Sequence, residues 1–90
     1  MYIPKEIFEA LQKVEEGMER EYKEKIVELQ YRELYKLHFG LGTWIRNTFL
    51  EKGGSLYNYF LGVGLDNADN MSTVLIMYLY FHLKSKKSGR

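Results

Sequence analysis

The sequence predicts an all-α protein: a compact bundle of four or five helices in a single domain over residues 1–84, followed by a basic flexible tail over residues 85–90. Apolar side chains recur in several segments at the spacing of one helix face. The chain has a single proline and a densely charged first third, and both features suit helices better than strands and turns. Ninety residues, 46% of them hydrophobic, are enough for one core and leave no room for a second domain.

Composition excludes several classes of function. The absence of cysteine excludes a disulfide scaffold, thiol catalysis and cysteine-ligated metal centres. Thirteen Lys and Arg against twelve Asp and Glu argue against a general nucleic-acid binder. The start of the chain has no apolar segment of a secretory signal, and the longest uncharged apolar run, residues 71–83, is shorter than the about 20 residues of a spanning helix. We therefore expect a cytoplasmic protein with no nucleic-acid or membrane partner.

The first two helices are expected over residues 4–16 and 19–30. Proline suits a first helical turn, where its missing N–H would be unpaired, so Pro4 marks the first start. The first helix carries an apolar stripe of Ile7, Ala10, Leu11, Val14 and Met18. The second has a narrow stripe of Tyr22, Ile26 and Leu29 among charged residues. These two helices should cover a core supplied by the second half of the chain, and the second should be the least stable.

The third helix is expected over residues 32–50, with a broad apolar arc that includes Trp44 and His38. Gly40 and Gly42 fall in its middle, where each costs about 1 kcal/mol relative to alanine. Such a cost indicates either a kink or the close approach of another backbone, and the sequence leaves both open.

A short fourth helix and a long fifth helix complete the bundle. Ser55 is a candidate N-cap after Gly53-Gly54, and Gly62 and Gly64 close the fourth helix. Asp69 is a candidate N-cap of the fifth, which runs to about Lys84.

The fifth helix is apolar almost all round. Its only polar strip consists of Thr73, Tyr80 and Lys84. Such a helix is either central in the bundle or covered by a partner. We expect the third and fifth helices to form the hydrophobic centre.

The segment from Leu37 to Asn47, read as LHFGLG, one variable position and WIRN, resembles the signature of a family of small bacterial domains of unknown function. Residues 2–5 and 69–72 are similar to the opening of that family and to the start of its last helix, whereas residues 17–30 match poorly. The resemblance implies an all-helical bundle of bacterial or phage-related origin. It implies no established activity.

Four polar residues form a candidate cluster: His38, Arg46, Asn47 and Asp69. A lone histidine on an apolar arc is usually a core residue, although imidazole can also serve catalysis. Arg46 lies in a region built for burial and needs an anionic partner, for which Asp69 is the natural choice, or it grips an acidic group of a ligand. His82 is the only other histidine, and no ligand spacing supports a metal site. We expect no metal and no cofactor.

The aromatic content indicates an interaction surface. A domain of this size cannot hide fourteen large rings completely, and exposed aromatic residues are typical interface anchors. Trp44, Tyr59, Tyr78 and Tyr80 are the candidate partner-binding residues. The predicted function is a non-enzymatic interaction module, either a homodimer or a binder or inhibitor of a larger protein. The alternative is a small-molecule or metal-dependent site built on His38, Arg46 and Asp69.

Overall fold

A computed structural model describes residues 2–88. It confirms an all-α, compact single globule, but the described residues form six helices rather than four or five. The helices are α1 (Lys5–Glu16), α2 (Arg20–Glu28), the 3₁₀ helix η1 (Tyr31–Leu37), α3 (Leu41–Phe49), α4 (Ser55–Gly62) and α5 (Ala68–Ser88).

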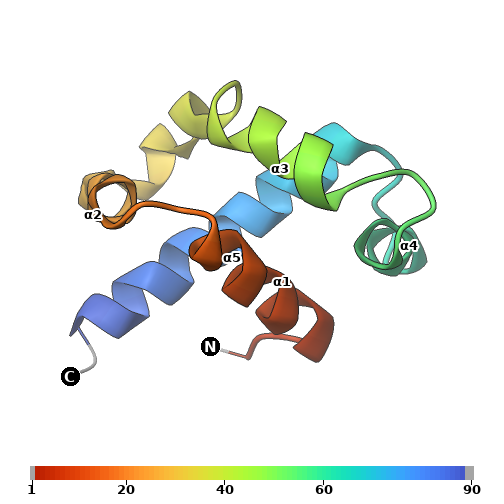
Figure 1. Cartoon of the computed structure of the whole chain (residues 1–90), viewed down its shortest axis with the longest axis horizontal. Coiled ribbons are helices and arrows are strands. Elements are labelled where there is room, and N and C mark those ends of the chain that lie inside the picture. The colour runs from red at the N-terminus through yellow and green to blue at the C-terminus, as the bar shows by residue number, and fades with distance from the viewer. Residues whose placement is uncertain (1, 89–90) are drawn as a thin grey trace.

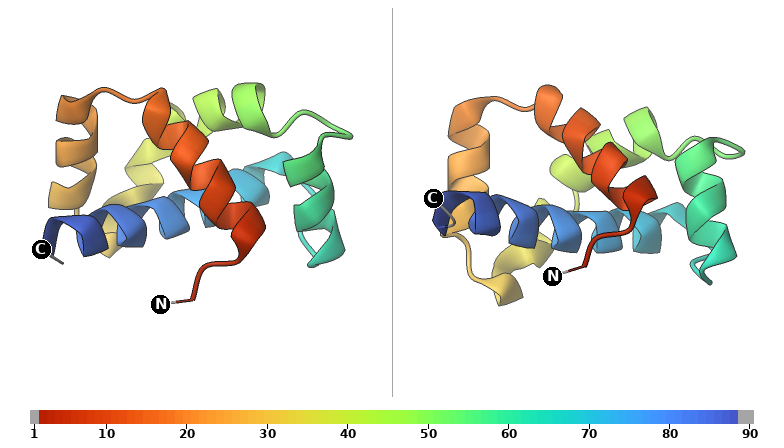
Figure 2. Two further views of the ribbon diagram at one scale, coloured as in Figure 1. Left: turned by 60° about the horizontal axis from the view of Figure 1, so that its bottom comes forward. Right: turned by 90° about the horizontal axis from the view of Figure 1, so that it is seen from below.

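Helix α5 is the centre of the fold. It contacts each of the other five helices, and it extends along the molecule with α4 near its N-terminal end and α2 near its C-terminal end (Figures 1 and 2). Met71, Leu75 and Leu79 are completely buried on it. Neighbouring helices therefore cover most of the apolar residues between positions 71 and 83, whereas Phe81 stays 40% exposed.

Helices α1 and α2 cover this centre as their apolar stripes predict. Ile7, Ala10, Leu11 and Val14 are buried on α1, and Ile26 is buried on α2. A polar contact also fixes α1 to α5, because the Glu15 carboxylate lies 2.9 Å from His82 Nε2 and 3.0 Å from Lys86 Nζ.

The helix predicted over residues 32–50 is interrupted. Residues 38–40 form a turn between η1 and α3, and Gly40 occupies the N-cap of α3 with φ −84° and ψ −80°. Gly42 has a different role: a Cβ there would lie 3.0 Å from Nη1 of Arg46 and 3.8 Å from Ile76 Cδ1. The first glycine lies at the break, and the second makes room for a guanidinium between α3 and α5.

The ends of α4 and α5 differ from the predicted ends. Helix α4 begins at Ser55 itself, and its N-cap is Gly54. Asn67 caps α5 in place of Asp69, because Asn67 Oδ1 accepts a hydrogen bond from the Asn70 N–H at 2.8 Å. At its other end α5 continues beyond Lys84 to Ser88, so the first four residues of the predicted tail are helical. Residues 89 and 90 of that tail lie outside the described residues.

None of the helices described over residues 2–88 combines the length and the apolar character that crossing a membrane requires.

Candidate functional site

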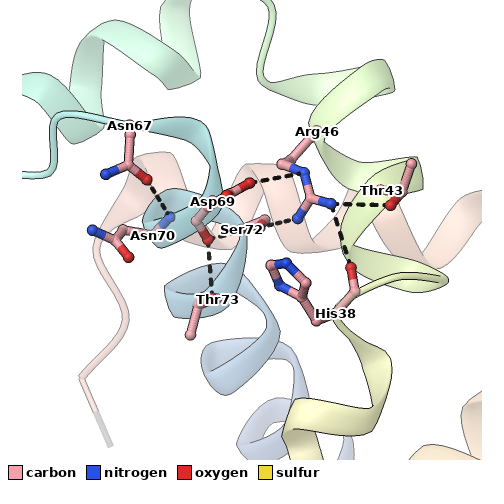
Figure 3. A network of polar contacts seen from close by, with 8 residues as sticks. All are labelled: His38, Thr43, Arg46, Asn67, Asp69, Asn70, Ser72 and Thr73. Carbon is pink, nitrogen blue, oxygen red and sulfur yellow. Dashed lines mark hydrogen bonds and ion pairs between the residues drawn. The ribbon is translucent and has the colours of Figure 1, made fainter.

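Arg46 is the hub of a polar network that joins α3, α5 and the turn after η1 (Figure 3). Its Nε lies 3.4 Å from Asp69 Oδ1, so the ion pair expected from the sequence is present. Nη1 donates to Ser72 Oγ at 3.0 Å, and Nη2 donates to Thr43 Oγ1 at 3.0 Å. Nη2 also donates to the carbonyl oxygen of His38 at 3.4 Å.

This network uses most of the hydrogen-bond donors of the Arg46 guanidinium. The Arg46 side chain is only 17% exposed, and all three of its nitrogen atoms contact oxygen atoms of the protein. Little is left to grip an external anion. The geometry therefore favours a structural role for Arg46, which ties the turn after η1 to the start of α5.

His38 and Asn47, the remaining members of the predicted polar cluster, bring no side chain into the network. His38 contributes its carbonyl oxygen to the network, whereas its ring meets the ring of Phe39 edge-on and lines a surface groove. The expectation of a buried core histidine is therefore wrong. Asn47 is exposed on α3 and takes no part in the network.

The two histidines do not converge. His82 pairs with Glu15 on α1, away from His38 and Asp69. Within residues 2–88 no three His, Asp or Glu side chains are grouped so that they could hold a metal ion.

The four predicted partner-binding residues do not form one surface. Tyr80 is 3% exposed, and its hydroxyl donates to the Leu29 carbonyl oxygen at 2.5 Å. The expectation of an exposed Tyr80 is therefore wrong, because the C-terminal end of α2 covers it. Trp44 is half-buried against Gly17, where a Cβ would approach the indole to 2.9 Å.

Tyr59 lies on α4 and Tyr78 lies on α5, and both side chains are partly buried against the core. Burial raises the pKa of Tyr59 above its ordinary value, and the carboxylate of Glu6 and the nearby Tyr78 add to the shift. These two rings therefore supply a small, partly covered patch rather than a free docking surface.

The exposed aromatic residues gather elsewhere, along η1. A groove of about 600 Å³ lies between η1 and α5, and we call it the aromatic groove. It is lined by Tyr31, Arg32, Leu34, Tyr35, His38, Phe39, Thr73, Ile76 and Met77. Phe81 extends its surface, because its ring stacks on Tyr31 with the ring centroids 5.5 Å apart.

Four aromatic side chains at or beside this groove are exposed to solvent. Tyr31 is 49% exposed, Tyr35 72%, Phe39 84% and Phe81 40%. At about 150–250 Å² for each aromatic side chain, they leave roughly 400–600 Å² open to solvent, comparable to the largest apolar patch on a typical monomer. Patches of this size often mark binding sites.

A capping box holds the 3₁₀ helix that carries these rings. The Gln30 N–H donates to Glu33 Oε1 at 2.8 Å, the Gln30 side chain bonds the Glu33 backbone in return, and Lys36 Nζ lies 3.2 Å from Glu33 Oε2. The hydrogen bond from Gln30 and the contact with Lys36 hold the pKa of Glu33 below its ordinary value of 4.5.

This lowered pKa predicts that η1 loosens in acid. The stabilisation is complete above the unfolded-state pKa and is lost as the pH falls through the lower folded-state pKa. In thermal unfolding at pH 7 and at about pH 3, the wild type should lose more stability than Glu33→Gln, whose side chain cannot titrate. Equal losses in the two proteins would contradict this contribution of Glu33.

The sequence contained a signal for this surface. Tyr31, Tyr35 and Phe39 stand four positions apart, the spacing that aligns side chains on one helix face. The helix predicted over residues 32–50 does not reveal this spacing. Its apolar arc lies on a different face, and it begins after Tyr31.

Comparison with known proteins places most of the chain in one family. Residues 3–83 match the model described as a domain of unknown function, DUF6794, and the chain belongs to this family. No curated protein and no solved structure matches the chain.

Proposed function

We propose that this member of the DUF6794 family is a non-enzymatic interaction module that binds another protein through the aromatic groove. One observation carries the proposal: Tyr31, Tyr35 and Phe39, between 49% and 84% exposed, line one groove, and Phe81, 40% exposed, stacks on Tyr31. Aromatic residues are enriched among the residues that dominate binding energy at protein interfaces.

The polar network offers less support for the alternative, a small-molecule site at His38, Arg46 and Asp69. Catalytic and binding groups need free donors or acceptors directed at a ligand. The Arg46 guanidinium is engaged with four protein oxygen atoms, and His38 contributes its carbonyl oxygen to the network rather than its ring. We therefore assign this network to stability and the groove to recognition.

A second copy of the chain is the simplest partner that the sequence suggests. In a two-fold dimer the same surface faces itself. Arg32 and His38 are the ionisable side chains that line the groove, apart from tyrosine hydroxyls, and both are basic. Self-pairing would add a second Arg32 to the groove and no acidic side chain from its lining, so the groove favours a different protein. We propose that this interaction takes place in the cytoplasm of a bacterial cell and that the protein is of bacterial or phage origin.

Photo-crosslinking from defined positions tests this function. A photoreactive amino acid at position 35 or 39 of the full chain, expressed in its host cell, should form adducts of defined mass with a partner protein. The same group at position 2 or 63 should not, although Tyr2 and Val63 are also exposed, at 83% and 59%. Those two positions lie outside the groove and are matched controls.

Binding of the purified partner then provides the quantitative measurement. Tyr35→Ser should weaken it at least tenfold in calorimetry, as expected for an aromatic anchor, while Tyr2→Ser should leave it unchanged. Because both residues are exposed, neither substitution should alter the melting temperature appreciably. Equal crosslinking from positions 2 and 35 would overturn the proposal, as would a dimer that Tyr35→Ser dissociates.

A further inference from the structure

The one permanently charged side chain in the lining of the aromatic groove is basic. Arg32 lines the groove and is exposed, His38 lines it farther along, and the lining contains no Asp or Glu. Lys84 adds a second permanent cation near the same end, because its Nζ lies 5.3 Å from the centroid of the Tyr80 ring, which itself packs against Tyr31. The groove therefore combines an apolar floor with a basic margin.

The acidic residues of the two helices that line the groove, η1 and α5, already have partners. The Glu33 carboxylate accepts hydrogen bonds from the Gln30 N–H and from Lys36 Nζ. Asp69 pairs with Arg46. No ion pair or hydrogen bond joins the Arg32 side chain to another described residue, although its charge contributes to the lowered pKa of Glu33. Its guanidinium thus offers a planar set of donors suited to a carboxylate.

The shape of the groove restricts its occupant to a short segment. A volume of about 600 Å³ between two helices accommodates several side chains from one strand or helix of a partner rather than the face of a whole domain. A concave surface also suits inserted side chains better than it suits a flat lipid layer.

We propose that the aromatic groove recognises an amphipathic peptide segment of a partner protein that carries apolar anchors and an adjacent carboxylate, and that Arg32 is the residue that selects the carboxylate. The proposal rests on the proposed function and adds the chemistry of the partner. The aromatic rings provide affinity by burying apolar area, whereas the Arg32 guanidinium provides the choice between acidic and basic segments.

Selection from a random 16-residue peptide library displayed on phage tests this chemistry with the full chain. Peptides enriched on the wild type should combine aromatic or aliphatic residues with Asp or Glu, and their affinity should fall as NaCl is raised from 50 to 500 mM. Arg32→Glu should weaken the best acidic peptide about tenfold or more, because it replaces attraction by repulsion, and should enrich basic peptides instead.

Lys52→Glu is the matched control for Arg32→Glu. It makes the same change in net charge at an exposed position outside the groove lining, so it should leave peptide affinity and peptide choice unchanged. Because Arg32 is exposed, Arg32→Glu should fold normally, which circular dichroism verifies.

The outcomes separate this inference from the function on which it rests. Peptides that require Tyr35 but show no charge preference and ignore Arg32→Glu would overturn the role of Arg32 and leave the groove as a docking site. Enrichment no greater than on a Tyr35→Ser, Phe39→Ser double variant would overturn peptide recognition altogether. Binding of phosphatidylserine vesicles that Tyr35→Ser and Arg32→Glu both abolish would assign the surface to a lipid and overturn the proposal.

Discussion

Tyr80→Ala is expected to lower the free energy of unfolding by about 3–5 kcal/mol, the usual cost of removing a buried aromatic side chain. Tyr80 is 3% exposed at the centre of the fold, and its hydroxyl bonds the Leu29 carbonyl oxygen beyond the end of α2. The substitution therefore leaves a cavity and an unpaired acceptor. Denaturant unfolding monitored by circular dichroism measures the change.

Two further variants divide this effect into its parts. Tyr80→Phe keeps the ring and removes the hydroxyl, so it should cost about 1–2 kcal/mol. Tyr78→Ala removes the same kind of side chain two positions away, where it is partly exposed, and should cost less than Tyr80→Ala. If Tyr78→Ala destabilises the protein as much as Tyr80→Ala does, the burial of Tyr80 does not set the cost.

Tyr80 also shows why the sequence located the wrong aromatic surface. On a helical wheel its hydroxyl places it in a polar strip with Thr73 and Lys84, which predicts exposure. The partner of that hydroxyl is a carbonyl 51 residues earlier in the chain. A pattern within one helix contains no information about such a distant backbone acceptor, so the wheel alone predicts a hydroxyl that faces solvent.

The prediction of an apolar stripe on α1 is confirmed for its first four members. The stripe from Ile7 to Val14 is buried because every fourth or third residue of α1 faces the same neighbour, whatever that neighbour is. The pairing of Arg46 with Asp69 was predictable for a different reason: a lone cation in an otherwise uncharged segment needs an anion, and few were available.

The break after η1 required tertiary information. Gly40 and Gly42 reduce the stability of a continuous helix, but that cost alone does not choose between a kink, a break and a close contact. In the fold, the His38 carbonyl oxygen accepts a hydrogen bond from Arg46, which holds the turn between η1 and α3. The break also leaves Tyr31, Tyr35 and Phe39 along the edge of the aromatic groove, a surface that the uninterrupted helix 32–50 did not predict.

Arg46→Ala is expected to destabilise the fold by roughly 2–4 kcal/mol, because it removes one ion pair and three hydrogen bonds from a mostly buried position. The Ser72 hydroxyl, which is completely buried, loses its donor. The His38 carbonyl oxygen loses the contact that ties the turn to α3. Denaturant unfolding measures the loss of stability, and chemical shifts of the Tyr35 and Phe39 amides report any change at the groove.

Asp69→Ala separates the contribution of the Arg46–Asp69 ion pair from that of the hydrogen bonds of Arg46. The Asp69 side chain is 69% exposed, so its carboxylate is screened by water and its removal should cost less than about 1 kcal/mol. Arg46→Lys keeps the charge but replaces the fork of donors by a single ammonium group. It should therefore retain only the smaller share of the stabilisation, the share that the ion pair with Asp69 provides. The amide shifts should follow the same order, with Arg46→Ala disturbing the groove and Asp69→Ala sparing it. Equal losses for Arg46→Ala and Asp69→Ala would mean that the ion pair alone carries the stabilisation, and the turn beneath Phe39 would then be held by something other than the guanidinium.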